Sequence, residues 1–333
     1  LQRPRSRQLS MAVVEEPSFA DLGVTHTEGS FVNPRQFTIF TQSWVPADPV
    51  ATLVLVHGLG EHSTRYLHFV RHLVKERIAV YALDHEAHGK SEGEKEFVAK
   101  VQHLVDDVIT YARTVHAKHE GLKRILFGHS LGGCVSLAVC EQEPDLFQYG
   151  VFSGPTTSRP PSVNAVLKAL GGVVGSLGPK LRLTPLDITT LCRDAEVVRT
   201  YTADPLVWHQ NIAAGFGSDI LSIGDKVLSK ADTFTTPALF LTGSADLIVS
   251  VNGVHKFFKE CASQDKTYIT LRGWYHELLN EPLNHLLMPV ITDWLKQRIA
   301  LKDAEVLQVN VDSEAVDPAA DSAEQRLIIT PIQ

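Results

Sequence analysis

Short runs of apolar residues recur along most of the chain, separated by longer segments in which apolar residues return every three or four positions. Runs of about six apolar residues predict buried strands, and the longer spacing predicts amphipathic helices. Strands are expected at 37–45 (an edge strand), 51–56, 78–83, 125–128, 149–152, 237–241 and 266–271. Helices are expected at 62–76, 97–118, 131–143 and 281–299, the last bent or divided at Pro289. This alternation predicts an α/β protein with a mostly parallel sheet covered by helices on both faces.

The alternation stops between residues 154 and 235, where six prolines occur and no strand is predicted. We interpret this stretch as a helical cap, or lid, inserted between two parts of one core, 35–153 and 236–301. Within the cap, residues 163–177 are mostly apolar, with one charge and several glycines. Two interpretations of this segment stay open, a mobile apolar flap and ordinary core packing.

The two ends of the chain lack the pattern. Residues 1–34 are expected to form a partly disordered N-terminal extension, in which Met11 is the natural start. Residues 302–333 hold seven acidic and two basic residues and are expected to form a disordered acidic tail. No uncharged apolar run approaches the ~20 residues of a membrane-spanning helix, and the first ten residues lack the apolar region of a secretory signal.

The net charge bears on the kind of partner that the protein binds, and the cysteines bear on its cellular compartment. The formal net charge of −7 argues against a nucleic-acid-binding surface. The four cysteines have neither paired nor metal-ligand spacing, and two of them, Cys134 and Cys140, lie in a predicted apolar helix. Buried thiols of this kind suit a reducing compartment. We therefore expect a cytoplasmic protein.

One short segment, residues 128–132 (Gly-His-Ser-Leu-Gly), lies between a predicted strand and a predicted helix. This is the G-x-S-x-G pattern of a nucleophile elbow, in which the chain turns sharply and exposes a serine at the carboxyl end of a strand. Gly128 and Gly132 would allow the close backbone approach that the turn requires. A turn that merely contains a small residue is the alternative, but the flanking strand and helix favour Ser130 as a nucleophile.

A serine nucleophile needs a histidine base and a carboxylate that orients it. In this architecture the acid and then the histidine follow the serine, each on a loop after a later strand. Asp246 follows the strand at 237–241, and His276 follows the strand at 266–271. Chemistry by these three residues needs no metal or cofactor. Weaker candidates for the acid, because of chain order or a place in the cap, are Asp84, Asp194 and Asp204.

The tetrahedral intermediate of such a reaction needs backbone N–H donors for its oxyanion. One donor is expected from Leu131, the residue after the nucleophile. The other is expected from the loop after an early strand, where residues 57–60 read His-Gly-Leu-Gly, and we assign it to Leu59.

Five separated motifs together resemble the monoacylglycerol lipases. They are residues 57–66 (H-G-L-G-E-H-S-T-R-Y), 84–93 (D-H-E-A-H-G-K-S-E-G), 128–133 (G-H-S-L-G-G), 243–246 (G-S-A-D) and 275–276 (Y-H). The resemblance covers about residues 35–300. It implies an α/β-hydrolase fold with a helical cap, and hydrolysis of a monoacylglycerol or related single-chain lipid ester. It also implies transient contact of the cap with a membrane surface.

The resemblance further implies contacts to the glycerol end of the substrate from Glu61, Arg65 and Tyr201. For Glu61 and Arg65 the alternative is an ordinary ion pair at the start of a helix, since they are four residues apart. Two positions depart from the family pattern. Ala87 replaces a glycine in the second motif, and Val249 stands where mammalian members have a reactive cysteine.

Other functions remain open on the same scaffold. A lysophospholipase, a broad carboxylesterase or a peptidase would use the same three residues with another substrate. A lipid-binding or receptor-like protein would keep the fold without the chemistry, but such proteins often lose a triad residue. Epoxide hydrolases and haloalkane dehalogenases use an aspartate nucleophile, so Ser130 counts against them.

Overall fold

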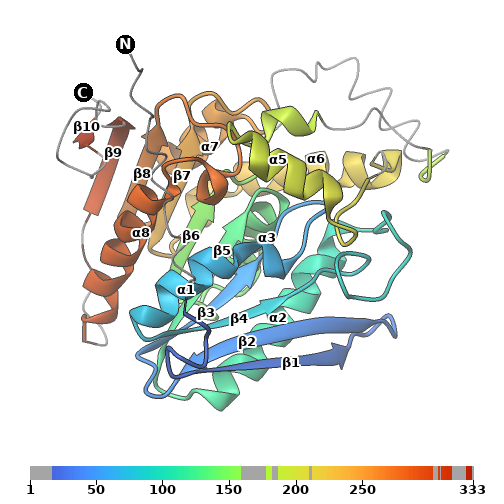
Figure 1. Cartoon of the computed structure of the whole chain (residues 1–333). Helices are drawn as coiled ribbons and strands as arrows, with labels where there is room; N and C mark the ends of the chain where they lie inside the picture. Colours follow the sequence, from blue (N-terminus) through green and yellow to red (C-terminus); the bar gives the residue numbers. More distant parts are fainter. Residues whose placement is uncertain are drawn as a thin grey trace, which may run out of the picture.

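The computed structural model describes residues 17–158, 178–181, 187–209, 212–302, 307, 309–316 and 328–331 (Figure 1). Within these residues, ten strands form one sheet in the order β1-β2-β4-β3-β5-β6-β7-β8-β9-β10. The strands are β1 (Val24–Val32), β2 (Thr38–Pro46), β3 (Ala51–Val56), β4 (Ile78–Leu83), β5 (Lys123–His129), β6 (Tyr149–Ser153), β7 (Ala238–Gly243), β8 (Asp265–Leu271), β9 (Val309–Val316) and β10 (Ile328–Pro331). From β4 through β3 to β9 in this order, neighbouring strands are parallel. By contrast, β1, β2 and β10 are antiparallel to their neighbours. The predicted α/β class and mostly parallel sheet are confirmed.

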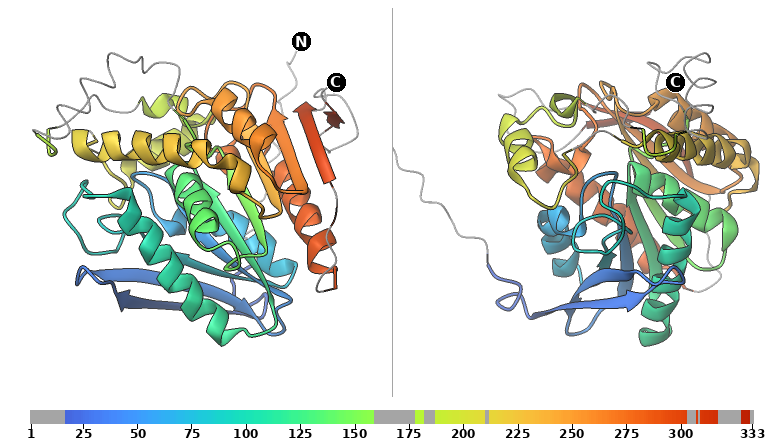
Figure 2. Two further views of the ribbon diagram at one scale, coloured as in Figure 1. Left: turned by 180° about the vertical axis from the view of Figure 1, so that it is seen from behind. Right: turned by 90° about the vertical axis from the view of Figure 1, so that its right-hand side faces the viewer.

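Helices cover both faces of the sheet, as the two views in Figure 2 show. Two helices pack on one face: α1 (Leu67–Lys75) and α8 (Asn284–Ile299). Four pack on the other: α2 (Val101–Lys118), α3 (Leu131–Gln142), α6 (Ala214–Ser229) and α7 (Val251–Glu260). Strand β3 explains the two layers, because Leu53 and Leu55 enter one core while Val54 and Val56 enter the other. A strand buried on both faces has no polar side, and β3 therefore reads as a continuous apolar run.

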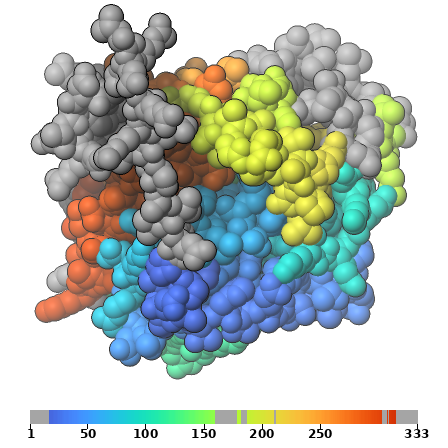
Figure 3. Space-filling model, viewed as in Figure 1, coloured from blue at the N-terminus to red at the C-terminus, as the bar shows by residue number. Residues whose placement is uncertain are grey.

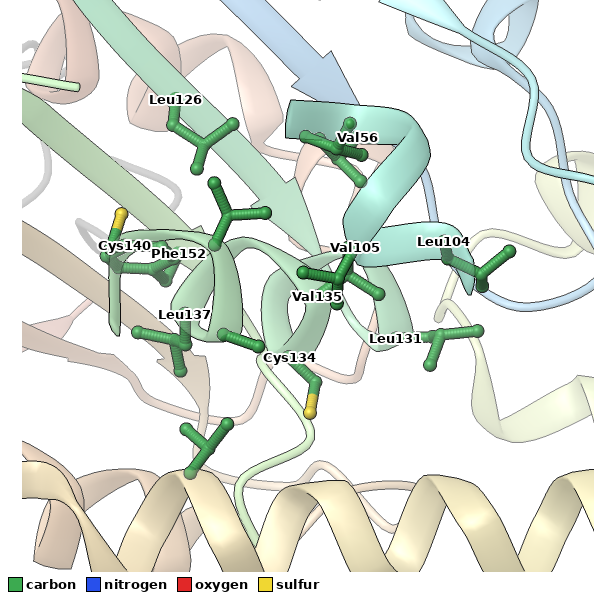
Figure 4. Packing of buried hydrophobic residues seen from close by; sticks show 14 of the residues in the cluster. Val56, Leu104, Val105, Leu126, Leu131, Cys134, Val135, Leu137, Cys140 and Phe152 are labelled. Carbon is green, nitrogen blue, oxygen red and sulfur yellow. The ribbon is translucent and has the colours of Figure 1, made fainter. Parts of the chain in front are cut away.

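Helix α3, which begins directly after Ser130, is buried along nearly its whole length. Figure 4 shows its side chains, among them Val135 and Leu137, between α2 and the strands β3, β5 and β6. Cys134 and Cys140 belong to this core, and burial raises the pKa of each thiol to about 12. The predicted buried thiols are therefore present, and the helix that follows Ser130 is anchored in the hydrophobic core.

Both ends of the chain contain strands that the pattern did not indicate. In β1, seven of nine residues are exposed, because the strand lies at the edge of the sheet with polar side chains. The expectation of a disordered tail is wrong for residues 309–316 and 328–331, which form β9 and β10. Two surface cations pair with the acidic residues of β9: Lys259 with Asp312 (2.5 Å) and Arg272 with Glu314 (2.5 Å). These ion pairs offset the negative charge that would otherwise oppose packing of β9 against β8.

The other differences are local. Pro289 does not divide α8. Proline has no N–H to donate to the carbonyl of His285, but both residues are exposed, so water can bind this carbonyl instead. In the expected cap, the described helices are α5 (Ala195–Ala203) and α6, with short 3-10 turns at Ile188–Thr190 and Ala231–Thr233. Helix α6 packs on the core through residues such as Phe216 and Val227. The expected flap at 163–177 lies outside the described residues. Among the described helices, none is long and apolar enough to cross a membrane.

Candidate active site

The turn between β5 and α3 has the strained geometry of a nucleophile elbow. Ser130 adopts φ 56° and ψ −119°, in the left-handed half of the map that residues other than glycine rarely occupy. A Cβ atom at Gly128 would overlap Ser136 Oγ and the carbonyl oxygen of Gly132. A Cβ atom at Gly132 would overlap the carbonyl oxygen of Val56. Both flanking glycines are therefore required by contact, as the sequence pattern predicts.

The structure brings Ser130, His276 and Asp246 together in one hydrogen-bonded chain. Ser130 Oγ lies 2.8 Å from His276 Nε2, and His276 Nδ1 lies 2.7 Å from Asp246 Oδ2. The second oxygen of Asp246 accepts the N–H groups of Ile248 (2.8 Å) and Val249 (3.0 Å). These two bonds fix the carboxylate, which in turn fixes the imidazole with its Nε2 toward the serine.

Burial and charge act in opposite directions on this chain. Burial disfavours protonation of His276, but the attraction and hydrogen bond of Asp246 prevail and raise its pKa above the ordinary 6.5. Burial likewise opposes ionisation of Asp246, yet His276 and the two backbone donors lower its pKa below the ordinary 3.8. The arrangement thus favours an imidazolium paired with a carboxylate, which is the charge pair that forms when histidine takes a proton from serine.

The two expected oxyanion donors belong to segments that adjoin Ser130. Leu131 is the first residue of α3, and the first N–H groups of a helix have no acceptor within it. The loop of Leu59 lies directly against the nucleophile, since a Cβ atom at Gly58 would come within 3.2 Å of Ser130 Cβ. Glu61 holds this loop, because its Oε1 accepts the Gly58 N–H at 2.6 Å.

Two of the three expected glycerol contacts are engaged within the protein. Arg65 Nη1 donates to Glu61 Oε2 (2.7 Å), and the guanidinium also binds both oxygens of Glu277 (2.7 and 2.8 Å). Tyr201, on α5, places its ring 4.6 Å from the guanidinium carbon of Arg65. For Glu61 and Arg65, the geometry favours the internal ion pair. Sequence reasoning missed Glu277, although a carboxylate directly after the predicted histidine was a signal.

Several histidines near the site have structural partners. His129 Nδ1 lies 3.0 Å from the Ser153 carbonyl oxygen, and burial lowers its pKa to about 4. His57, His85 and His88 form a buried cluster with ring centroids 4.5 to 5.9 Å apart, and burial lowers the pKa of each. Trp208 stacks on His88 at 4.0 Å. All four histidines are therefore held neutral near pH 7.

Trp208 also joins the expected cap to the core. Its backbone N–H donates to the Gly60 carbonyl (2.8 Å), and its Nε1–H donates to the Ala87 carbonyl (3.0 Å). Nearby, His62 Nε2 lies 2.9 Å from Asp204 Oδ2. Figure 3 shows this yellow-green part of the expected cap resting on the light-blue surface of the core. The loop that carries Leu59 is thus fixed from the cap side as well.

The three weaker acid candidates have other partners. Asp84 accepts the N–H and hydroxyl of Ser63 at 2.8 and 2.6 Å. Asp194 caps the first turn of α5 by accepting the Glu196 N–H (2.8 Å), and Asp204 faces His62. The structure brings none of the three to His276, so Asp246 stays the candidate acid.

The structure shows the local environment of both residues that depart from the family pattern, Ala87 and Val249. Ala87 adopts φ 67°, a conformation that suits glycine, which accounts for the glycine usual there. Val249 is buried, and its backbone N–H holds Asp246, a bond that does not depend on its side chain.

Among the described residues, no group of three or more histidine, cysteine, aspartate or glutamate side chains is placed to hold a metal ion.

Comparison with known proteins gives one consistent family. The family model described as serine aminopeptidase, S33, matches residues 47–283. The monoacylglycerol lipase of Mycolicibacterium smegmatis is 34% identical over 272 residues, which are 81% of this chain and 97% of that protein. Human monoglyceride lipase is 32% identical over 81% of this chain and 90% of its own length.

A solved structure agrees with the sequence comparison. The crystal structure of Paleococcus ferrophilus monoacylglycerol lipase superimposes with a TM-score of 0.69 and 30% identity, covering 82% of this chain and 98% of that one. The fold and the resemblance carried by the five motifs are thereby confirmed. The chain belongs to the α/β-hydrolase family described as serine aminopeptidase, S33, together with these monoacylglycerol lipases.

Proposed function

We propose that this protein hydrolyses monoacylglycerols to a fatty acid and glycerol through an acyl-enzyme intermediate. The observation that carries the proposal is the hydrogen-bonded chain from Ser130 through His276 to Asp246 at a strained elbow. The names of its relatives supply the substrate class, since they are monoacylglycerol lipases that match most of this chain.

In the proposed mechanism, His276 Nε2 takes the proton of Ser130 as Oγ attacks the ester carbonyl carbon. Asp246 stabilises the imidazolium, and the N–H groups of Leu59 and Leu131 hold the oxyanion. The intermediate collapses as His276 protonates the leaving glycerol oxygen. His276 then accepts a proton from water, which attacks the acyl-enzyme, and Ser130 regains its proton as the fatty acid leaves.

We propose Tyr201 as the side chain of this set that contacts glycerol directly. It lies on the cap beside Arg65, whereas both oxygens of Glu61 already accept hydrogen bonds from the protein. In this proposal Glu61 and Arg65 shape the glycerol end of the site from behind. A hydroxyl-lined site of this kind would favour a free diol over a fully acylated glycerol.

We also propose that the cap end of the protein touches the lipid surface from which the substrate comes. Two large apolar side chains support this proposal by their exposure. Leu247, directly after Asp246, is 67% exposed, and Leu181, between α3 and α5 in the chain, is 58% exposed. In a vesicle sedimentation assay, we expect the Leu247→Ser and Leu181→Ser variants to bind vesicles less than the wild type does. Their turnover of a soluble ester is expected to stay unchanged. Unchanged binding would count against this surface.

The decisive experiment measures fatty-acid release from monoolein, diolein, lysophosphatidylcholine and a short soluble ester, with Ser130→Ala as the control. Monoolein far ahead of the others, with all release lost in Ser130→Ala, is the expected result. Lysophosphatidylcholine ahead would keep the mechanism and make the protein a lysophospholipase. A short ester ahead would make it a general carboxylesterase. No release that depends on Ser130 would refute the proposal.

A further inference from the structure

A buried cluster of three charged side chains lies beside the candidate triad and takes no part in the mechanism above. Arg65 lies between two carboxylates, bound to Glu61 by one hydrogen bond and to Glu277 by two. The side chain of Arg65 is 11% exposed, and those of Glu61 and Glu277 are 5% exposed. Two parallel bonds between a guanidinium and a carboxylate fix both position and orientation.

The ends of this cluster are attached to two different loops of the site. Glu61 Oε1 accepts the N–H of Gly58 and, at 2.5 Å, the hydroxyl of Tyr66. Glu277 is the residue after His276, and its Oε2 also accepts an N–H of Asn280 at 2.7 Å. Arg65 and Glu277 are 212 positions apart in the chain. The cluster therefore ties the loop beside the nucleophile to the loop that carries the base.

The cluster also places charge near His276. As ion pairs, the two carboxylates and one guanidinium carry one net negative charge. After Asp246, Glu277 and then Glu61 are the charged groups that raise the pKa of His276, while its burial opposes them. His129, whose ring centroid lies 4.8 Å from that of His276, is held neutral near pH 7 and does not offset this effect.

Two described side chains of the expected cap lie beside this cluster, and both are uncharged near pH 7. Tyr201 faces Arg65, and Cys192 lies close enough to feel the charge of Glu277. Burial first, and then the nearby carboxylates, raise the pKa of the Tyr201 hydroxyl above its ordinary 10 and that of the Cys192 thiol to about 12. Both groups are therefore neutral near pH 7. Arg193, the described cation of the expected cap beside this loop, is paired with Glu281. The described part of the cap therefore leaves the net negative charge of the cluster in place near His276.

We propose that Glu277 is a positioning residue for this active site. Through Arg65 it holds the His276 loop against the Gly58 loop. Its buried negative charge also stabilises the imidazolium that forms when His276 takes the proton of Ser130. This inference rests on the proposed use of Ser130, His276 and Asp246 as a catalytic triad, but not on the identity of the ester.

The test is the pH dependence of kcat/KM for Glu277→Gln with a soluble p-nitrophenyl ester. Glutamine keeps the shape and one acceptor but removes the charge, which makes His276 a weaker base. The acid limb of the profile is therefore expected to move to lower pH, and the plateau to fall roughly tenfold. A purely structural role would lower the plateau and leave the acid limb in place.

Asp265→Asn is the matched control. Asp265 forms an even more deeply buried two-bond pair with Arg298, but at the opposite end of β8 from His276. This variant is expected to lower the melting temperature without moving the acid limb. Glu277→Asp keeps the charge and withdraws the carboxylate, so kcat is expected to fall while the acid limb stays close to that of the wild type.

Three results would overturn the inference. The first is an unmoved acid limb in folded Glu277→Gln, and the second is an equal shift in Asp265→Asn. The third, decisive even if Glu277→Gln does not fold, is an unchanged kcat in Glu277→Asp, because the position of the carboxylate would then not matter. Absence of Ser130-dependent hydrolysis in the wild type would instead refute the proposed function, and this inference with it.

Discussion

Substituting Arg65 by methionine removes the guanidinium that lies between the buried carboxylates of Glu61 and Glu277. Deleting one partner of a buried ion pair costs about 3–5 kcal/mol, because an uncompensated charge stays in the protein interior. The pKa of Glu61 gives a figure of the same order. Burial would raise it, but Arg65 above all holds it at about 2, below the ordinary 4.5. A carboxylate pKa depressed that far corresponds to about 3 kcal/mol of folding free energy at neutral pH.

The sign of the pH dependence follows from the direction of this shift. The stabilisation from Glu61 is fully present above pH 4.5 and is lost as the pH falls toward 2. In Arg65→Met the buried carboxylate lacks this cation, so burial raises its pKa and the variant folds most readily with Glu61 protonated. The difference in unfolding free energy between wild type and variant is therefore largest near pH 7 and smaller at pH 4.

Urea denaturation at pH 7 and pH 4 measures this difference without adding salt. The matched control is Arg199→Met, because Arg199 pairs with Glu196 on the surface, where the two side chains are 68% and 63% exposed. An exposed pair contributes at most about 1 kcal/mol. We expect a loss of about 3–5 kcal/mol for Arg65→Met at pH 7. A loss below about 1 kcal/mol, the scale of an exposed pair, or an equal loss at both pH values, would refute the reasoning.

Three further predictions concern the triad and the loop of Ala87. Asp246→Asn is expected to lower kcat about 10⁴-fold while substrate binding persists, as steady-state kinetics would show; a loss below tenfold would exclude Asp246 as the acid. Because the pKa of His276 is raised, labelling of Ser130 by a fluorophosphonate should decline as the pH falls through a value above 6.5; a midpoint below 6 would contradict this. Ala87→Gly relieves a left-handed alanine, which costs about 1–2 kcal/mol, but adds about 0.5–1 kcal/mol of chain entropy. A small gain in thermal stability is expected, and a loss above about 1 kcal/mol would show that packing of the Ala87 methyl group dominates.

Strand burial decided which elements were predictable. All six residues of β3 are buried, so the strand stands out as an apolar run. Strand β1 is mostly exposed at the edge of the sheet and has no such signature. In β9 the acidic residues suggested a solvated tail, yet Asp312 and Glu314 pair with Lys259 and Arg272, which lie far away in the sequence. Local composition cannot report a partner on another element.

The same distinction applies to the site. The sequence by itself indicated Ser130, Asp246 and His276 as candidates. Ser130 directly follows β5, the other two lie on the loops after β7 and β8, and parallel strands end at one edge of the sheet. The sequence also indicated the glycines around Ser130, since a sharp turn leaves no room for a Cβ atom. Only the tertiary structure decided that Arg65 is bound to Glu277, because this pair joins residues 212 positions apart. Local periodicity reports how a side chain is buried, whereas its partner is set by which loops the folded sheet brings together.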